Sequence, residues 1–104
     1  MAVQLVRLKS GEDVIADVNN MYKDETKASL IGYVFKRPCV AYLHPIVDDV
    51  DGRTGHKVEL TSWMPLTKDD QIPVPLDWVV TMTTPVDTLM EMYQKDVVNF
   101  ENDE

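Results

Sequence analysis

The stretch VRLKSGEDVIADV, residues 6–18, carries the clearest structural signal in this chain. An alternating strand runs into a tight turn at residues 9–12, and a second alternating strand follows at once. Gly11 supplies the positive φ that a tight hairpin connection needs, and apolar side chains occupy every second position from Val14 to Val18. The stretch therefore predicts a β-hairpin and favours a small all-β domain.

Alternating apolar residues on both sides of this hairpin predict five extended segments in total, at about residues 2–8, 13–21, 29–44, 57–64 and 77–83. The third segment is apolar on both faces, so we expect it to be covered on both. Pro38 removes a ladder donor from its middle and Gly32 lacks a side chain, so this long strand should bend, bulge or break there. Residues 48–55 predict a hairpin loop, and residues 67–75 predict a polar, proline-stiffened connection.

After residue 83 the apolar period changes from two to three or four, which indicates one C-terminal helix over about residues 85–97. Thr84 can cap this helix and Pro85 suits its first position. Its apolar stripe comprises Val86, Leu89, Met90, Tyr93 and Val97. Rolling the strands into a small barrel, with the helix closing one open end, would bury the apolar residues. The expected fold class is therefore mainly all-β: a strongly bent five-stranded barrel with one C-terminal α-helix.

A length of 104 residues, 44% of them hydrophobic, suits one domain with one core. We expect this domain to span residues 1–98, with the barrel at about 2–83, and a flexible acidic tail at 99–104. Cys39 has no second cysteine to pair with, and no apolar signal segment follows the first residue. No run reaches the ~18 apolar residues of a membrane span, so no membrane contact is expected and the cytoplasm is the expected compartment, that of the host cell for a phage-encoded chain.

Charge is distributed unevenly along the chain. Ten lysines and arginines against eighteen carboxylates give a net charge of -8, which is unfavourable for nonspecific binding of a polyphosphate. Residues 22–38 nevertheless hold four cationic and two anionic side chains, whereas residues 91–104 hold one and five. We therefore expect one basic face and an acidic C-terminal end.

The expected architecture, together with LKSGEDVIADV at residues 8–18, resembles the first Sm motif of the Sm and Sm-like RNA-binding proteins; the matching residues are Leu8, Lys9, Gly11 and Val14. The whole chain, including WVVTMTTP at residues 78–85, is similar to Sm-like proteins of marine bacteriophages. This resemblance implies a homo-oligomeric ring, in the pentamer to heptamer range, whose copies join edge to edge by strands. It also implies binding of RNA or DNA.

The chain departs from the Sm pattern in several places. Ala16 stands where the motif usually has glycine, and neither the Asp-x-x-Met-Asn signature nor the Arg-Gly pair of the second motif is present. The helix of the family normally precedes the barrel, whereas the predicted helix follows it. The resemblance therefore carries over the fold and no base-specific contact.

Aromatic and basic residues are interleaved between residues 22 and 37, a mixture that suits single-stranded nucleic acid because rings stack on bases and cations neutralise phosphates. In the alternative interpretation Tyr33 and Phe35 belong to the core and the lysines only solvate a loop. A second basic cluster surrounds the loop at residues 48–55. The candidate nucleic-acid-binding residues are Tyr22, Lys23, Lys27, Lys36, Arg37, Arg53 and Lys57.

The strands of an open barrel leave unpaired edges, which a ring would cover. Large side chains on the last two strands, including two tryptophans, could close the core or an interface between copies. The candidate interface residues are Val58, Leu60, Met64, Val79 and Met82.

The remaining patterns point away from catalysis. The aspartates near residue 50 lack the closing glutamate of a calcium loop, two histidines and one cysteine form no zinc set, and no nucleophile or phosphate-loop motif occurs. We therefore expect no metal, no cofactor and no enzymatic activity. The first hypothesis is a ring-forming, single-strand-binding protein acting in processing of phage RNA or DNA. The alternative is a protein-interaction or assembly module that acts through its acidic surface and C-terminal helix.

Overall fold

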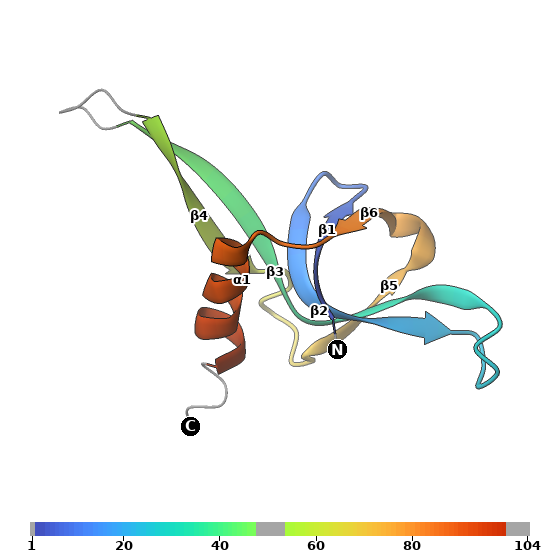
Figure 1. Ribbon diagram of the computed structural model, residues 1–104. Coiled ribbons are helices and arrows are strands. Elements are labelled where there is room, and N and C mark those ends of the chain that lie inside the picture. The colour runs from blue at the N-terminus through green and yellow to red at the C-terminus, as the bar shows by residue number, and fades with distance from the viewer. Residues whose placement is uncertain (1, 48–53, 100–104) are drawn as a thin grey trace.

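The computed structural model describes residues 2–47 and 54–99 and contains, within them, six strands and one C-terminal helical segment (Figure 1). The strands are β1 (Val3–Leu8), β2 (Asp13–Tyr22), β3 (Leu30–Val47), β4 (Thr54–Ser62), β5 (Gln71–Pro75) and β6 (Val79–Thr83). A 3-10 turn, Leu76–Trp78, links β5 to β6, and helix α1 (Asp87–Tyr93) continues into a π-helical turn, Gln94–Val98. The sheet is antiparallel, in the order β4-β3-β2-β1-β6, and β5 pairs with β3 beside this path.

The first predicted hairpin is confirmed. β1 and β2 pair in the register that places Val6 opposite Val14, and Gly11 in the connection has a φ of 90°. The Gly11 amide donates to the Leu8 carbonyl at 2.9 Å, which closes the turn. At the strand ends the Arg7 guanidinium donates to both carboxylate oxygens of Asp13, at 2.7 and 2.9 Å.

The predicted distortion of the third strand is also confirmed. Between the pairs Ile15–Cys39 and Asp17–Lys36, β3 contains one residue more than β2, so the ladder has a bulge at this point. Arg37 lies inside the bulge with a φ of 51°, next to the proline that lacks a donor. β3 therefore bends, and its two halves pair with different strands (Figure 1).

The prediction of five strands is wrong, because a sixth strand, β5, forms within the segment predicted to be a connection. β4 pairs with residues 39–47 of β3, and β5 pairs with residues 32–36 of the same strand. Residues 63–70 link β4 to β5, so only residues 67–70 of the predicted connection at 67–75 are a connection.

Ladder geometry explains why the prolines at positions 73 and 75 do not prevent β5 from forming. The Arg37 amide donates to the Asp70 carbonyl at 2.9 Å, and hydrogen-bonded pairs then alternate along the antiparallel ladder. Ile72 and Val74 consequently direct their backbone groups toward β3, whereas Pro73 and Pro75 turn their nitrogens away from it. A proline is tolerated in a strand at such an outward position.

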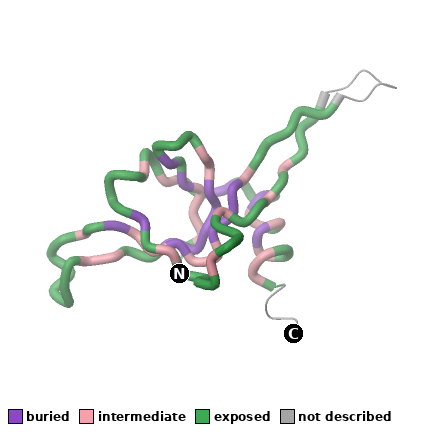
Figure 2. The backbone as a smooth tube through the Cα atoms, turned by 180° about the vertical axis from the view of Figure 1, so that it is seen from behind, coloured by how far each residue is buried: buried purple, intermediate pink, exposed green. Residues whose placement is uncertain are grey.

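Two apolar clusters lie on opposite faces of the bent sheet, because neighbouring residues of a strand point in opposite directions. The inner cluster contains Val6, Leu8, Val14, Ala16, Val18, Phe35, Val40 and Val74. The outer cluster contains Ile15, Cys39, Leu89 and Tyr93. Figure 2 shows the buried backbone concentrated where the strands cross, with exposed hairpins extending from it. Since β4 and β6 end the strand order, the sheet is bent but is not a closed barrel.

The C-terminal helix differs from its prediction in start and position. Val86 is the N-cap, without a side-chain cap hydrogen bond, so Thr84 and Pro85 precede the helix. Leu89 and Tyr93 pack against the outer cluster, where they cover strand residues that would otherwise face solvent. The helix therefore lies against the outer face of the sheet beside β3 and β4, instead of closing an open end (Figure 1).

Candidate nucleic-acid interface

The first group of candidate residues lies at the turn between β2 and β3. Tyr22 ends β2 and is half-buried, and Lys23 and Lys27 are exposed in the turn. Asp24 accepts hydrogen bonds from the backbone and hydroxyl of Thr26, which lower the pKa of its carboxyl and keep it ionised. The turn therefore carries an ionised carboxylate, that of Asp24, between its two lysines in the chain.

A second group lies at the bend of β3. Lys36 and Arg37 are half-buried, and their carbonyls accept the Tyr93 hydroxyl at 3.2 and 2.9 Å. Tyr93 is fully buried, and this burial raises the pKa of its phenol to about 12. Through these hydrogen bonds the helix fixes the position of the backbone at Lys36 and Arg37. Phe35, next along β3, packs in the inner cluster against Trp63, so the core interpretation of this ring is correct.

The third group does not join the other two. Lys57 is exposed on β4, in the β3–β4 hairpin, and Arg53 lies outside the described residues. The β2–β3 and β3–β4 hairpins extend in opposite directions from the centre of a molecule that is 60 Å long (Figure 1). The predicted basic residues therefore occupy three separate places instead of one basic face.

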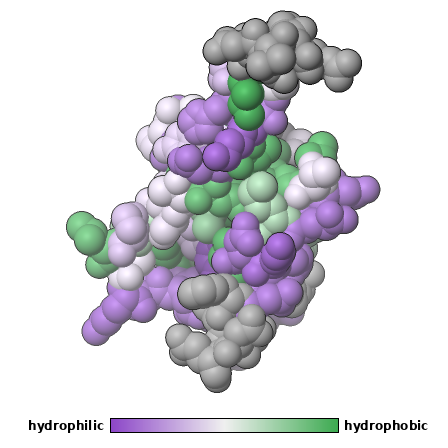
Figure 3. Space-filling model, turned by 90° about the vertical axis from the view of Figure 1, so that its left-hand side faces the viewer, coloured by the Kyte–Doolittle hydropathy of each residue, from purple (hydrophilic) through white to green (hydrophobic). Residues whose placement is uncertain are grey.

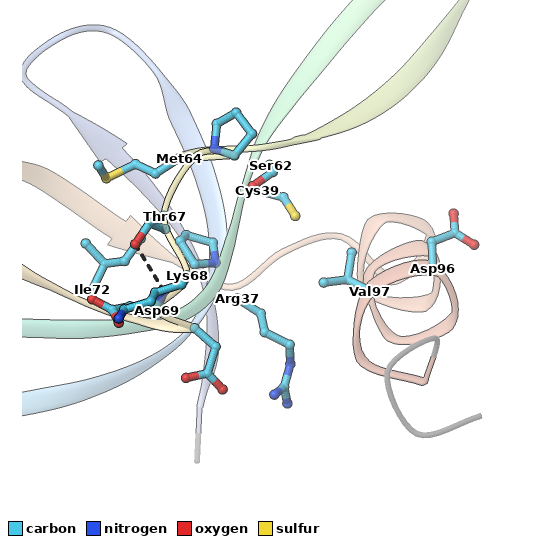
Figure 4. A pocket seen from close by; sticks show the side chains of 13 residues that line it. Arg37, Cys39, Ser62, Met64, Thr67, Lys68, Asp69, Ile72, Asp96 and Val97 are labelled. Atoms are coloured by element: carbon cyan, nitrogen blue, oxygen red, sulfur yellow. Dashed lines mark hydrogen bonds between the residues drawn. The ribbon is translucent and has the colours of Figure 1, made fainter. Parts of the chain in front are cut away.

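A cleft of about 380 Å³ opens beside the loop at residues 63–70, between β4 and β5 (Figure 4). Its walls come from the bend of β3, the loop at residues 63–70 and the end of the helix. Arg37 and Lys68 line it together with three carboxylates, those of Asp69, Asp70 and Asp96. This charge balance does not favour an anion. The thiol of Cys39 also lines the cleft, but burial raises its pKa, so the thiol stays protonated.

Sequence reasoning did not identify this cleft. The signal that could have found it is the segment at residues 65–70, which begins with a proline and ends with three charged side chains before the next apolar residues. Its walls come from three distant parts of the chain, which only the folded structure brings together.

The candidate interface residues divide between the two faces of the sheet. Val58 and Leu60 pack against the outer cluster, and Val79 and Met82 pack against the inner cluster. Met64 is 47% exposed. Four of the five side chains therefore contribute to the core of their own protomer, and a contact of any of them with another copy stays a prediction.

The backbone at the strand edges is better placed for such a contact. The Trp63 amide donates to the Pro38 carbonyl at 3.1 Å, which sets the alternation along the β3–β4 ladder. Val58 and the other even-numbered residues of β4 consequently direct their N–H and C=O groups away from β3. β4 thus presents an edge with both donors and acceptors, and β6 forms the opposite end of the strand order in the described structure.

The protein is thus a small β-domain with an antiparallel, strongly bent and open sheet. Its two edge strands, β4 and β6, differ from each other, and edge strands of this kind can pair with strands of another chain. The Sm-like domain model matches residues 5–94, and the chain belongs to this family. No curated protein matches the chain. Over residues 2–47 and 54–99, no group of histidine, cysteine and carboxylate side chains could hold a metal ion, and no helix is long and apolar enough to span a membrane.

Proposed function

We propose that this protein is a non-enzymatic Sm-like protein that forms a homo-oligomeric ring and binds single-stranded RNA or DNA. Membership of the Sm-like family supports this proposal, because the family fold is a small, oligomeric, nucleic-acid-binding fold. The resemblance of the whole chain, including residues 78–85, to Sm-like proteins of marine bacteriophages extends the proposal to processing of phage nucleic acid in the host cytoplasm.

The observation that carries the ring is the pair of unlike edges. A contact between two different surfaces of identical copies repeats around an axis and closes into a ring when the rotation allows it. The edge of β4 offers donors and acceptors, whereas prolines remove two donors from the outward side of β5. The ladder between copies is therefore proposed to run along β4 of one protomer and β6 of the next.

Proline placement tests this ladder. Val58→Pro removes an outward N–H and leaves the β3–β4 ladder intact, so the variant should fold while its solution mass falls to that of a monomer. Pro73→Ala is the matched control, since it adds a donor to the edge of β5 and should leave the mass unchanged. Light scattering after size exclusion measures both masses, and circular dichroism confirms that both variants fold. A monomeric wild type would refute the ring.

The nucleic-acid part of the proposal predicts an affinity that falls with salt. Each phosphate contact with a single strand contributes about 0.7 to the slope of log K against log salt concentration. Replacing Lys23 and Lys27 together by glutamine lowers this slope by about 1.4 when the strand crosses the β2–β3 turn and leaves it unchanged when the strand binds elsewhere, as measured by fluorescence anisotropy of short labelled oligonucleotides. Lys68→Gln, in the carboxylate-lined cleft, is the matched control and should leave the slope unchanged. Absence of binding at low salt would remove this function.

The net charge of -8 favours a second candidate, a protein-interaction module. Figure 3 shows apolar surface on the side of the molecule that lies at the left in Figure 1. Exposed apolar side chains include Leu43 on β3 and Val86 at the start of α1, which are 63% and 67% exposed. Recovery of one specific protein partner, together with no nucleic acid, would decide in favour of this module.

A further inference from the structure

The outer part of the β3–β4 hairpin projects from the rest of the molecule as a two-stranded arm, comprising residues 41–46 and 55–60. β2 pairs with β3 only as far as Val40, so beyond this point β3 has β4 as its sole strand neighbour in the described structure. Figures 1 and 2 show the arm extending away from the buried centre, with mostly exposed residues. An isolated two-stranded hairpin is marginally stable in water, so the arm depends on packing at its base.

The two faces of the arm have different surroundings. Ala41, Val58 and Leu60 share one face and pack against the outer cluster that α1 covers. The opposite face consists of Tyr42, His44 and Ile46 together with the cross-strand partners Glu59, Lys57 and Gly55, and we name it the aromatic face. No element of the described structure covers the aromatic face, and Tyr42 and Ile46 are 44% and 46% exposed.

The two rings of the aromatic face are already arranged for stacking. Their centroids lie 6.1 Å apart and their planes differ by 24°. Side chains that alternate along a strand recur every ~6.7 Å, which is about twice the 3.4 Å between stacked bases. A base placed between two such rings would therefore lie near stacking distance of both. The next residue inward on this face, Val40, belongs to the inner cluster, so the row begins at the core.

The aromatic face carries a negative charge toward the core and a positive charge toward the tip of the arm. Lys57 is exposed and stands directly opposite His44. Glu59 stands opposite Tyr42, and its carboxylate lies 3.9 Å from the Nε2 atom of His44. Cationic charge for a phosphate is therefore available at Lys57, toward the tip of the arm, while the aromatic surface lies immediately beside it.

We propose that the aromatic face of the arm is a binding site for single-stranded nucleic acid, in which a base stacks on Tyr42 and His44 and Lys57 neutralises an adjacent phosphate. This inference rests on the proposed function and names a contact surface for it. Stacking of bases on exposed rings beside a cation is independent of base sequence and serves RNA and DNA alike. A protein partner would instead be expected to use the apolar side of the arm.

Two variants separate stacking from charge. Tyr42→Thr removes the ring in a residue type that suits strands, and should weaken binding of short labelled oligouridylate and oligothymidylate at least about fivefold with an unchanged salt slope. Lys57→Gln should lower the slope by about 0.7. Leu43→Thr is the matched control, because Leu43 is an exposed neighbour of Tyr42 on the opposite face of the arm, and it should alter affinity by less than about twofold.

The outcomes separate this inference from the function on which it rests. If the wild type binds and both Tyr42→Thr and Lys57→Gln bind as the wild type does, the aromatic face is not the site, and the function stands. If the wild type binds no oligonucleotide at low salt, both proposals fail. Melting temperatures equal to that of the wild type show that each variant is folded, and a Leu43→Thr loss as large as that of Tyr42→Thr would also overturn the assignment.

Discussion

The hydroxyl of Tyr93 holds the bend of β3, so replacing Tyr93 by phenylalanine should destabilise the protein measurably. The side chain is fully buried, and its hydroxyl is shared between the carbonyls of Lys36 and Arg37. Removing it leaves these acceptors without the donor while the ring keeps its packing. Loss of a buried hydrogen bond of this kind costs about 1–3 kcal/mol. For a domain of this size the melting temperature should fall by about 5–15 °C.

Urea denaturation followed by circular dichroism measures this change. Tyr22→Phe is the matched control, because its hydroxyl accepts an exposed hydrogen bond from Asn20 and its loss should cost less than about 0.5 kcal/mol. Equal midpoints for Tyr93→Phe and the wild type would refute the reasoning, since the helix would then not hold the bend through this hydroxyl.

The same residue predicts a specific loss of stability in alkali. Burial raises the pKa of Tyr93 to about 12 from an ordinary value of 10.0, so the folded state prefers the neutral phenol. The stability that this preference provides is complete below pH 10 and is lost as the pH rises toward 12. By pH 11 the wild type should lose about 1.4 kcal/mol more than Tyr93→Phe, in paired denaturation curves at each pH. Parallel curves for the two proteins would contradict the assigned pKa.

Three further substitutions test the packing of the fold by thermal or chemical unfolding. Gly32→Ala places a methyl group against the Val74 carbonyl oxygen and should cost about 1–3 kcal/mol, unless β5 can leave β3 without penalty. Leu89→Ala empties a buried position under the helix and should cost about 2–5 kcal/mol; a smaller loss would show that α1 is not needed to cover the outer cluster. Gly11→Ala meets no neighbour but requires a positive φ, so it should cost about 1 kcal/mol, and a neutral effect would mean that the turn relaxes.

Much of the fold follows from patterns within short segments. The glycine turn and alternating residues around Gly11 predict the first hairpin, and the proline at position 38 predicts the bulge of β3. These features depend on residues close together in the chain, so period and turn chemistry are sufficient to locate them. The change of period after residue 83 likewise predicts a helix. The helix begins later than predicted, because Val86 and not Thr84 is its N-cap.

The candidate site was less predictable for a geometric reason. Lys23 and Lys57 belong to basic clusters in the sequence, but a bent strand of eighteen residues separates their hairpins in space. The alternating pattern predicts that Tyr42 and His44 lie in a strand covered on both faces, yet the pairing with β2 ends at Val40 and leaves them exposed. Where a neighbouring strand stops is determined by long-range register, which composition does not reveal.

The amino-acid sequence by itself determined a mainly β domain, its first turn, the distortion of its longest strand and a helix at its C-terminal end, because each depends on local backbone preferences. Only the tertiary structure decided that residues 71–75 form the additional strand β5 and that α1 covers the outer face. Both outcomes depend on the bend of β3. Because the two halves of β3 run in different directions, one half pairs with β4 and the other with β5, and an apolar outer face is left for α1 to cover. Pairing between distant segments therefore set the free edges and the projecting arm.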